Sequence, residues 1–209
     1  MHIPDGFLAV NTWAVLWVVS AGGLGYCLKK TARFLQDKMV PLMGVMSAFI
    51  FAAQMLNFPI AGGTSGHLLG GVLAAVLLGP YAGALCISCV LIVQCLIFQD
   101  GGLTALGANI FNMAIVGTMG GYLVYGMIRL GLRRANGILI GAAVAAWFSV
   151  IAASGACAVE LSISGTSPLS VALPAMLGVH ALIGIGEAVI TVLVIGFILK
   201  VRPDLIYKT

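Results

Sequence analysis

Long hydrophobic runs separated by short polar segments dominate this chain, and they predict membrane-spanning helices. A membrane-spanning helix needs about 20 consecutive apolar residues. Seven stretches reach or approach that length, and the pieces between them hold glycine, proline or charged residues. We expect helices at 7–28, 39–56, 67–78, 81–98, 106–128, 137–156 and 177–199. Polar loops are expected around 57–66, 99–102 and 160–168.

Composition agrees with this pattern. The 209 residues are 61% hydrophobic and 8% charged, with a mean hydropathy of +1.15, whereas a soluble domain carries roughly 25% charged residues. The polar, turn-like start lacks the basic and apolar regions of a cleavable signal peptide, so we expect Met1 to be the mature end. The predicted fold is a single all-α polytopic membrane helix bundle over residues 1–209.

The placement of basic residues predicts the orientation of the bundle. The ten lysines and arginines form three clusters, each beside a predicted helix: Lys29, Lys30, Arg33 and Lys38; Arg129, Arg133 and Arg134; Lys200, Arg202 and Lys208. Such clusters mark cytoplasmic loops. With seven spans, an outside N-terminus and an inside C-terminus, all ten lie in the cytoplasm and Asp5, Asp100 and Glu160 lie outside. No stacking platform accompanies these charges, so nucleic acid is not an expected partner.

The N-terminus itself could chelate a metal ion. The Met1 amine, the amide nitrogen of His2 and the His2 imidazole Nδ1 close a five-membered and a six-membered ring around one ion. Three nitrogens then lie in one plane, and square-planar nitrogen sites select Ni(II) or Cu(II). The amide must lose its proton, so binding should strengthen as pH rises.

The other two histidines extend this hypothesis. His67 follows the glycine-rich loop at 62–66, on the same predicted side as His2, and could supply a fourth nitrogen. His180 and Glu187 are seven residues apart, so they share one helix face. An acid inside a membrane helix needs a partner; Glu187 could support the site or simply pin helices together, and His180 could be a supporting residue or an alternative ligand.

Other patterns have competing explanations. Gly63-Thr64-Ser65-Gly66 resembles the G-x-S-G of rhomboid intramembrane serine proteases, with His180 as a base, but no Trp-Arg pair accompanies it. Cys86-x-x-Cys89 lacks a second pair with zinc spacing. Met39, Met43 and Met46 share a helix face, which is more often packing than a Cu(I) path. Binding and transport, without catalysis, is the favoured interpretation.

Energy for transport must come from elsewhere if transport is active. The chain contains no G-x-x-x-x-G-K-[ST] loop, so it does not bind ATP by that route. Nor is there a chain of buried acids for proton coupling. An ATP-driven complex is favoured, and a self-sufficient secondary metal carrier is the alternative.

Four segments carry a resemblance to a known family. They are MHIPDGFL at 1–8, NFPIAGGTSGHLLGG at 57–71, DGGLTALGAN at 100–109 and HALIGIGE at 180–187. With these, nearly the whole chain resembles the CbiM/NikM family, the substrate-binding membrane components of nickel and cobalt energy-coupling-factor transporters.

The resemblance implies a seven-helix bundle in a prokaryotic cell (inner) membrane, with residues 1–6 tucked into the metal site. It implies capture of Ni(II) or Co(II) as transported substrate, with nickel favoured by the planar nitrogens. It also implies a membrane-embedded coupling subunit, two cytoplasmic ATPases and, in some systems, a small accessory membrane subunit. Met1, His2 and His67 are the expected ligands. The residues expected to support them are Asn57, Thr64, Ser65, Asp100, Asn109, His180 and Glu187.

Overall fold

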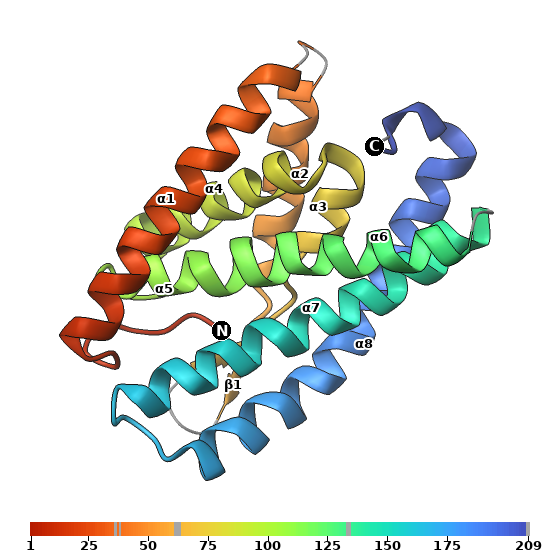
Figure 1. Cartoon of the computed structure of the whole chain (residues 1–209). Helices are drawn as coiled ribbons and strands as arrows, with labels where there is room; N and C mark the ends of the chain where they lie inside the picture. Colours follow the sequence, from red (N-terminus) through yellow and green to blue (C-terminus); the bar gives the residue numbers. More distant parts are fainter. Residues whose placement is uncertain (36, 38, 61–63, 133–134, 208–209) are drawn as a thin grey trace.

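A computed structural model describes residues 1–35, 37, 39–60, 64–132 and 135–207, and for Phe58–Ile60, Thr64, Ser65, Ala135 and Asn136 the backbone only. These residues form a helical bundle with one small hairpin (Figure 1). The elements are α1 (Val10–Phe34), α2 (Met39–Gln54), β1 (Phe58–Ile60), β2 (Thr64–Gly66), α3 (Gly71–Leu78), α4 (Pro80–Phe98), α5 (Leu106–Ile110), η1 (Phe111–Gly120), α6 (Gly121–Gly131), α7 (Ala135–Ile163), α8 (Leu169–Val201) and η2 (Pro203–Leu205).

Several helices have the length and apolar character that crossing a membrane requires. They are Pro80–Phe98, Leu106–Gly131, Gly137–Ile163 and Leu169–Val201, and α2 is a shorter apolar helix. This confirms a multi-pass membrane protein built from helices, while the count of seven spans stays a prediction. The eight residues of α3 extend only about 12 Å at 1.5 Å per residue, so α3 alone is too short to cross.

One predicted loop and the start of the helix after it differ from the structure. The loop predicted at 160–168 is wrong in its first part, because α7 continues to Ile163. Glu160 is buried in this helix and accepts a 2.7 Å hydrogen bond from Asn112 Nδ2 of η1. Its other oxygen, Oε1, is buried without a hydrogen-bond partner. Glu160 is therefore a second buried acid of the bundle, in addition to Glu187. α8 correspondingly begins at Leu169, earlier than the predicted start at 177.

The glycine-rich segment forms the hairpin. β1 and β2 pair antiparallel with Phe58 opposite Gly66, which adds two short strands to the otherwise all-α fold. Residues 67–70 then run as extended chain to α3, so the helix predicted at 67–78 starts four residues late. Gly70 has a φ of 75°, a left-handed conformation that glycine adopts without steric cost. This non-helical segment carries His67 into the centre of the bundle.

A π-helix interrupts the middle span. α5, η1 and α6 form one continuous helix from Leu106 to Gly131, and its central ten residues are wound with π geometry. Such segments often occur at functional sites. η1 packs against α3, α4 and α7, and it places Asn112 opposite Glu160.

The ends of the helices separate by charge. In Figure 1 the C-terminal ends of α1, α6 and α8, which carry Lys29, Arg129 and Lys200, lie toward the top and right of the bundle. The loops after α4 and α7 lie on the opposite side, at the left. This separation supports the predicted orientation, which remains a prediction.

Candidate metal centre

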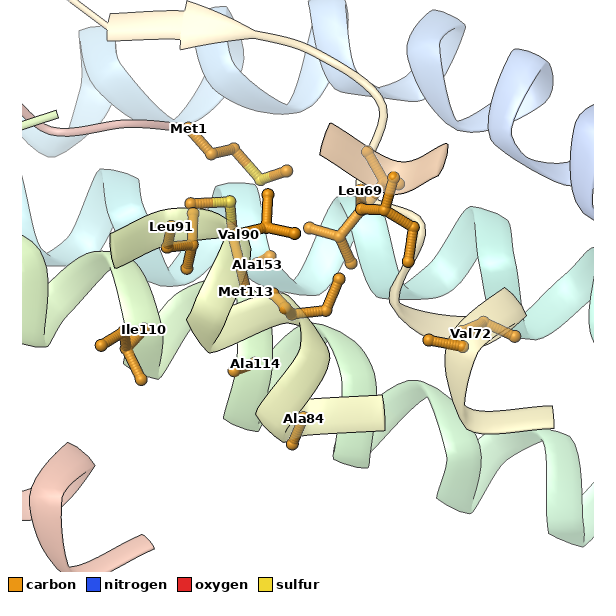
Figure 2. Packing of buried hydrophobic residues seen from close by; sticks show 14 of the residues in the cluster. Met1, Leu69, Val72, Ala84, Val90, Leu91, Ile110, Met113, Ala114 and Ala153 are labelled. Carbon is orange, nitrogen blue, oxygen red and sulfur yellow. The ribbon is translucent and has the colours of Figure 1, made fainter. Parts of the chain in front are cut away.

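The first three residues of the chain are part of the core. Met1 and Ile3 have no exposed surface and His2 is 3% exposed. The Met1 side chain lies among Leu69, Val90 and Leu91 (Figure 2). The N-terminal residues 1–3 are therefore held inside the bundle, whereas Asp5 and Gly6 are exposed. Insertion of the segment 1–6 into a metal site stays a prediction.

Backbone hydrogen bonds fix the N-terminal segment in place. Ile3 N–H donates to Asn109 Oδ1 at 2.8 Å, and Asn109 Nδ2 donates to Ile3 O at 3.2 Å. Gly102 N–H also donates to Ile3 O at 2.8 Å. One buried amide side chain thus pairs with both polar groups of Ile3, which sets the position of Met1 and His2 relative to α5.

Asp5 makes a second attachment. Its carboxylate accepts hydrogen bonds from Leu103 N at 3.0 Å, from Thr104 N at 2.7 Å and from the Thr104 hydroxyl. These bonds to the charged form, led by the one from the Thr104 hydroxyl, lower the pKa of Asp5. A Cβ added to Gly102 would lie 2.2 Å from Asp5 N, so the two backbones meet where only glycine fits.

The His2 and His67 imidazoles lie face to face. Their ring centroids are 4.5 Å apart with an interplanar angle of 29°. His67 Nδ1 is 2.7 Å from Leu68 O, which makes Nδ1 the protonated nitrogen, since a carbonyl can only accept. The lone pair of His67 then sits on Nε2, which is buried and has no hydrogen-bond partner. A buried, unpaired nitrogen beside a second imidazole is a donor available to an ion.

Asp100 lies at the Nε2 edge of the His2 ring. Its Oδ2 is 3.7 Å from His2 Nε2 and accepts a 2.9 Å hydrogen bond from Asn57 Nδ2. A carboxylate behind an imidazole favours the proton on the nitrogen that faces it. Here that leaves the Nδ1 lone pair of His2 for an ion, which is the nitrogen that the N-terminal chelate requires.

Burial also sets the protonation of the donors. Desolvation lowers the pKa of the Met1 amine from 8.0 to about 5, an effect that Cys157 and Asp100 only partly oppose. Desolvation, with the neighbouring amine, likewise holds the pKa values of His2 and His67 well below 6.5. These lowered pKa values favour the uncharged form of all three groups at neutral pH, which is the form that binds metal ions.

Glu187 of α8 holds the segment that follows His67. Its carboxylate accepts hydrogen bonds from Leu69 N at 2.9 Å and from Gly70 N at 2.7 Å. On the other side, Gln54 Nε2 donates to Leu69 O at 2.7 Å. The backbone two residues after His67 is therefore attached to α8 and to the end of α2 at once.

His180 also belongs to α8, seven residues before Glu187. It is fully buried, its Nδ1 is 2.7 Å from Met176 O, and its Nε2 has no hydrogen-bond partner. The N-terminal amine and His67 both interact electrostatically with it. The structure thus brings all three histidines toward one centre.

Among the described residues, no three side chains of His, Cys, Asp or Glu form a metal cluster. A site here must therefore use the amine and amide nitrogens of the N-terminus together with the imidazoles. Cys86 is buried and Cys89 exposed. Met46 is buried, and Met39 and Met43 pack against the core, which agrees with the packing explanation for this stripe.

The supporting residues predicted from sequence have different outcomes. Asn57, Asp100, Asn109, His180 and Glu187 lie at the site as described above. The side chains of Thr64 and Ser65, and the whole of Gly63, lie outside the described residues.

Sequence reasoning missed Gln54 and the attachment of Asp5 to Thr104. A glutamine inside an apolar helix requires a partner, so Gln54 could have been found from its position within 39–56. Nothing local distinguishes Thr104 from other loop threonines.

The buried, nitrogen-rich centre lies in a bundle whose longer helices have the length and apolar character of membrane spans, the class of a multi-pass membrane protein. Comparison with known proteins agrees, since the model of the CbiM family, described as the cobalt uptake substrate-specific transmembrane region, matches residues 2–205. This chain belongs to the CbiM family.

Individual relatives cover almost the entire chain. The fused nickel transport protein NikMN of Rhodobacter capsulatus is 37% identical over 224 residues, covering 99% of this chain and 64% of its own length. A protein of Archaeoglobus fulgidus assigned the same fused NikMN name is 46% identical and covers 99% of this chain and 68% of its own length. One from Methanocaldococcus jannaschii, assigned as cobalt transport protein CbiM, is 33% identical and covers 100% of this chain and 91% of its own.

A solved structure has the same fold. The crystal structure of a truncated transition metal transporter is 38% identical to this chain, with a TM-score of 0.89, and the match covers 96% of this chain and 99% of that one.

Proposed function

We propose that this chain captures Ni(II) or Co(II) for uptake, at a site formed by the Met1 amine, the His2 amide nitrogen, His2 Nδ1 and His67 Nε2. The observation that carries the proposal is the contact between the buried His2 and His67 rings beside a buried, neutral amine. Family membership and the nickel and cobalt names of the relatives support the choice of ions.

The proposed donor set favours a square-planar ion. The amine, the amidate and the His2 imidazole are fixed in one plane by their chelate rings, and His67 Nε2 completes four nitrogens. Low-spin Ni(II) suits this set, and Cu(II) would bind it more tightly in the intrinsic order of divalent metals. Discrimination against copper therefore rests on metal availability and on the transport partners.

The binding test is metal content, measured by mass spectrometry on protein with a free N-terminus. We expect about one nickel or cobalt per chain, lost in His2→Ala, in His67→Ala and in a variant extended by two residues before Met1. For nickel content, His180→Ala is the matched control, because it removes a buried imidazole outside the proposed nickel ligands. If the extended variant binds as well as the native protein, the amine is not a ligand and the proposed centre is wrong.

Transport requires further subunits in this proposal. Because the sequence carries no ATP-binding loop of the G-x-x-x-x-G-K-[ST] type, we propose that a membrane-embedded coupling subunit and two cytoplasmic ATPases supply the energy. Metal uptake by cells should then disappear when the ATPases are deleted. Uptake that persists would instead identify a self-sufficient carrier.

A further inference from the structure

A cavity lies outside the metal centre and shares no lining residue with it. It has a volume of about 880 Å³ and lies between the end of α1, the start of α2, the junction of α3 and α4, and the C-terminal segment at 204–207. His67 precedes α3, and the cavity lies at the C-terminal end of α3, whose eight residues extend about 12 Å at 1.5 Å per residue. The cavity is within the size range of small-molecule sites, about 300–1,000 Å³.

The cavity is a built feature with fixed walls. The C-terminal segment is attached by a 2.9 Å hydrogen bond from Tyr207 N to Val76 O, and Ile206 is buried. The Tyr207 ring packs on Gly79, where an added Cβ would lie 2.8 Å from the ring. Gly79 has a φ of 85°, which favours glycine, so a larger residue here would be strained and would press against the Tyr207 ring.

The lining combines apolar walls with cationic and hydroxyl groups. Phe34, Leu42 and Leu78 are among its apolar side chains, and Lys30 and Arg33 contribute positive charge. Thr31, which also lines the cavity, has a buried Oγ1 with no hydrogen-bond partner. A buried hydroxyl without a partner is unfavourable and indicates a donor or acceptor that a ligand would satisfy.

The charges facing the cavity sum to a positive field. Lys30 Nζ lies 5.4 Å from the centre of the Tyr26 ring, which keeps the ammonium at this position on α1. Asp204 also lines the cavity, but both of its oxygens accept hydrogen bonds from Arg202, at 2.9 and 2.8 Å. That carboxylate is neutralised by its neighbour, and Lys30 and Arg33 remain for an anion.

We propose that this cavity binds the phosphate group of one anionic membrane lipid, with the acyl chains against its apolar walls. Lys30 and Arg33 contact the phosphate and the Thr31 hydroxyl donates to one of its oxygens. Basic pockets between membrane helices at the cytoplasmic side bind anionic head groups in this way. The apolar walls favour a lipid over a soluble anion, since inorganic phosphate would leave Phe34 and Leu42 facing water.

The test uses the delipidated full chain and native mass spectrometry with phosphatidylglycerol or phosphatidylcholine at equal concentration. We expect one phosphatidylglycerol to bind at least tenfold more tightly than phosphatidylcholine. The double variant Lys30→Gln/Arg33→Gln should lose at least tenfold of that affinity, and Thr31→Val a smaller part. Nickel content should stay unchanged in all of them, because Lys30, Thr31 and Arg33 line the cavity and are not among the proposed metal ligands.

The matched control is Lys29→Gln/Lys200→Gln, which removes two positive charges at the same end of the molecule but outside the cavity. The control pair should retain phosphatidylglycerol. Equal loss in both pairs would show general surface attraction and overturn the proposal, as would equal binding of the zwitterionic lipid. Displacement of the lipid by equimolar inorganic phosphate would mean a soluble-anion site, which also contradicts it.

Discussion

Glu187 is the residue through which we expect the metal centre to depend on α8. Its two carboxylate oxygens accept from Leu69 N and Gly70 N at 2.9 and 2.7 Å. Both amides follow His67 within three residues. Replacing Glu187 by alanine leaves these two N–H groups buried without an acceptor, while Gln54 still holds Leu69 O.

The size of the effect follows from these bonds. Each buried donor left unpaired costs about 1–3 kcal/mol, so the two together cost about 2–6 kcal/mol if the segment stays in place. The segment at 67–70 can instead detach from α8. Detachment limits the free-energy cost of the substitution but releases His67 from its position. Loss of a supporting group of this kind weakens metal binding by about 10–100-fold. Glu187→Gln keeps one acceptor and should lie between alanine and the native protein.

Calorimetric titration of nickel into purified protein measures this directly, beside the thermal unfolding of the metal-free chain. Thr191→Val is the matched control, because it changes a buried polar residue four positions further along α8. We expect Thr191→Val to bind nickel like the native protein. If Glu187→Ala also bound nickel with native affinity, Glu187 would serve only to join helices, and the reasoning that connects it to His67 would be refuted.

Three further predictions follow from the same geometry. Gly102→Ala should prevent the N-terminal segment from docking, because the new Cβ would lie 2.2 Å from Asp5 N. The variant should be folded by circular dichroism but should no longer bind nickel. Gly22→Ala, where the added Cβ meets nothing within 4 Å, should bind nickel normally. Above pH 5 the nickel affinity should rise about tenfold per pH unit, because the His2 amide loses one proton on binding. Below pH 5 the rise should be steeper, since the Met1 amine, with its pKa of about 5, also binds protons there. A steeper slope already at pH 7–8 in a pH titration would show that the amine is charged in the metal-free protein. His180→Ala should change nickel affinity by less than about threefold but weaken cobalt binding by about tenfold, because Co(II) takes further ligands beyond a planar four. Equal losses of affinity for both ions in competition titrations would contradict a role of His180 as an additional cobalt ligand.

The sequence could predict that the N-terminus and His67 lie together, because the parts of the proposed chelate are local in the chain. The N-terminal chelate needs only consecutive atoms of Met1 and His2, and the basic clusters placed the His67 loop on the same predicted side. The structure confirms that these parts meet, with the rings of His2 and His67 4.5 Å apart. Binding of a metal there is a proposal that the ring contact supports.

The errors came from pairings between distant residues. In the sequence, Glu160 is followed closely by serines, and this pattern predicts the start of a loop. Its partner in the bundle is Asn112, 48 residues away. The segment at 67–70 reads as helix because it joins an apolar run, but its backbone bonds to Glu187, more than a hundred residues later. Hydropathy reports the solvent a segment prefers and carries no information about such partners.

The burial of Met1, His2 and Ile3 has a consequence for the rate at which an ion is exchanged. If these residues supply ligands, the ion is enclosed by the segment that holds it, and it can depart only after the bonds between Asn109 and Ile3 open. Residence times should therefore be long compared with those of ions on exposed histidines. Rapid delivery into the cell would then depend on another molecule lowering the barrier to withdrawal of the N-terminal segment, which makes release the step at which transport is controlled.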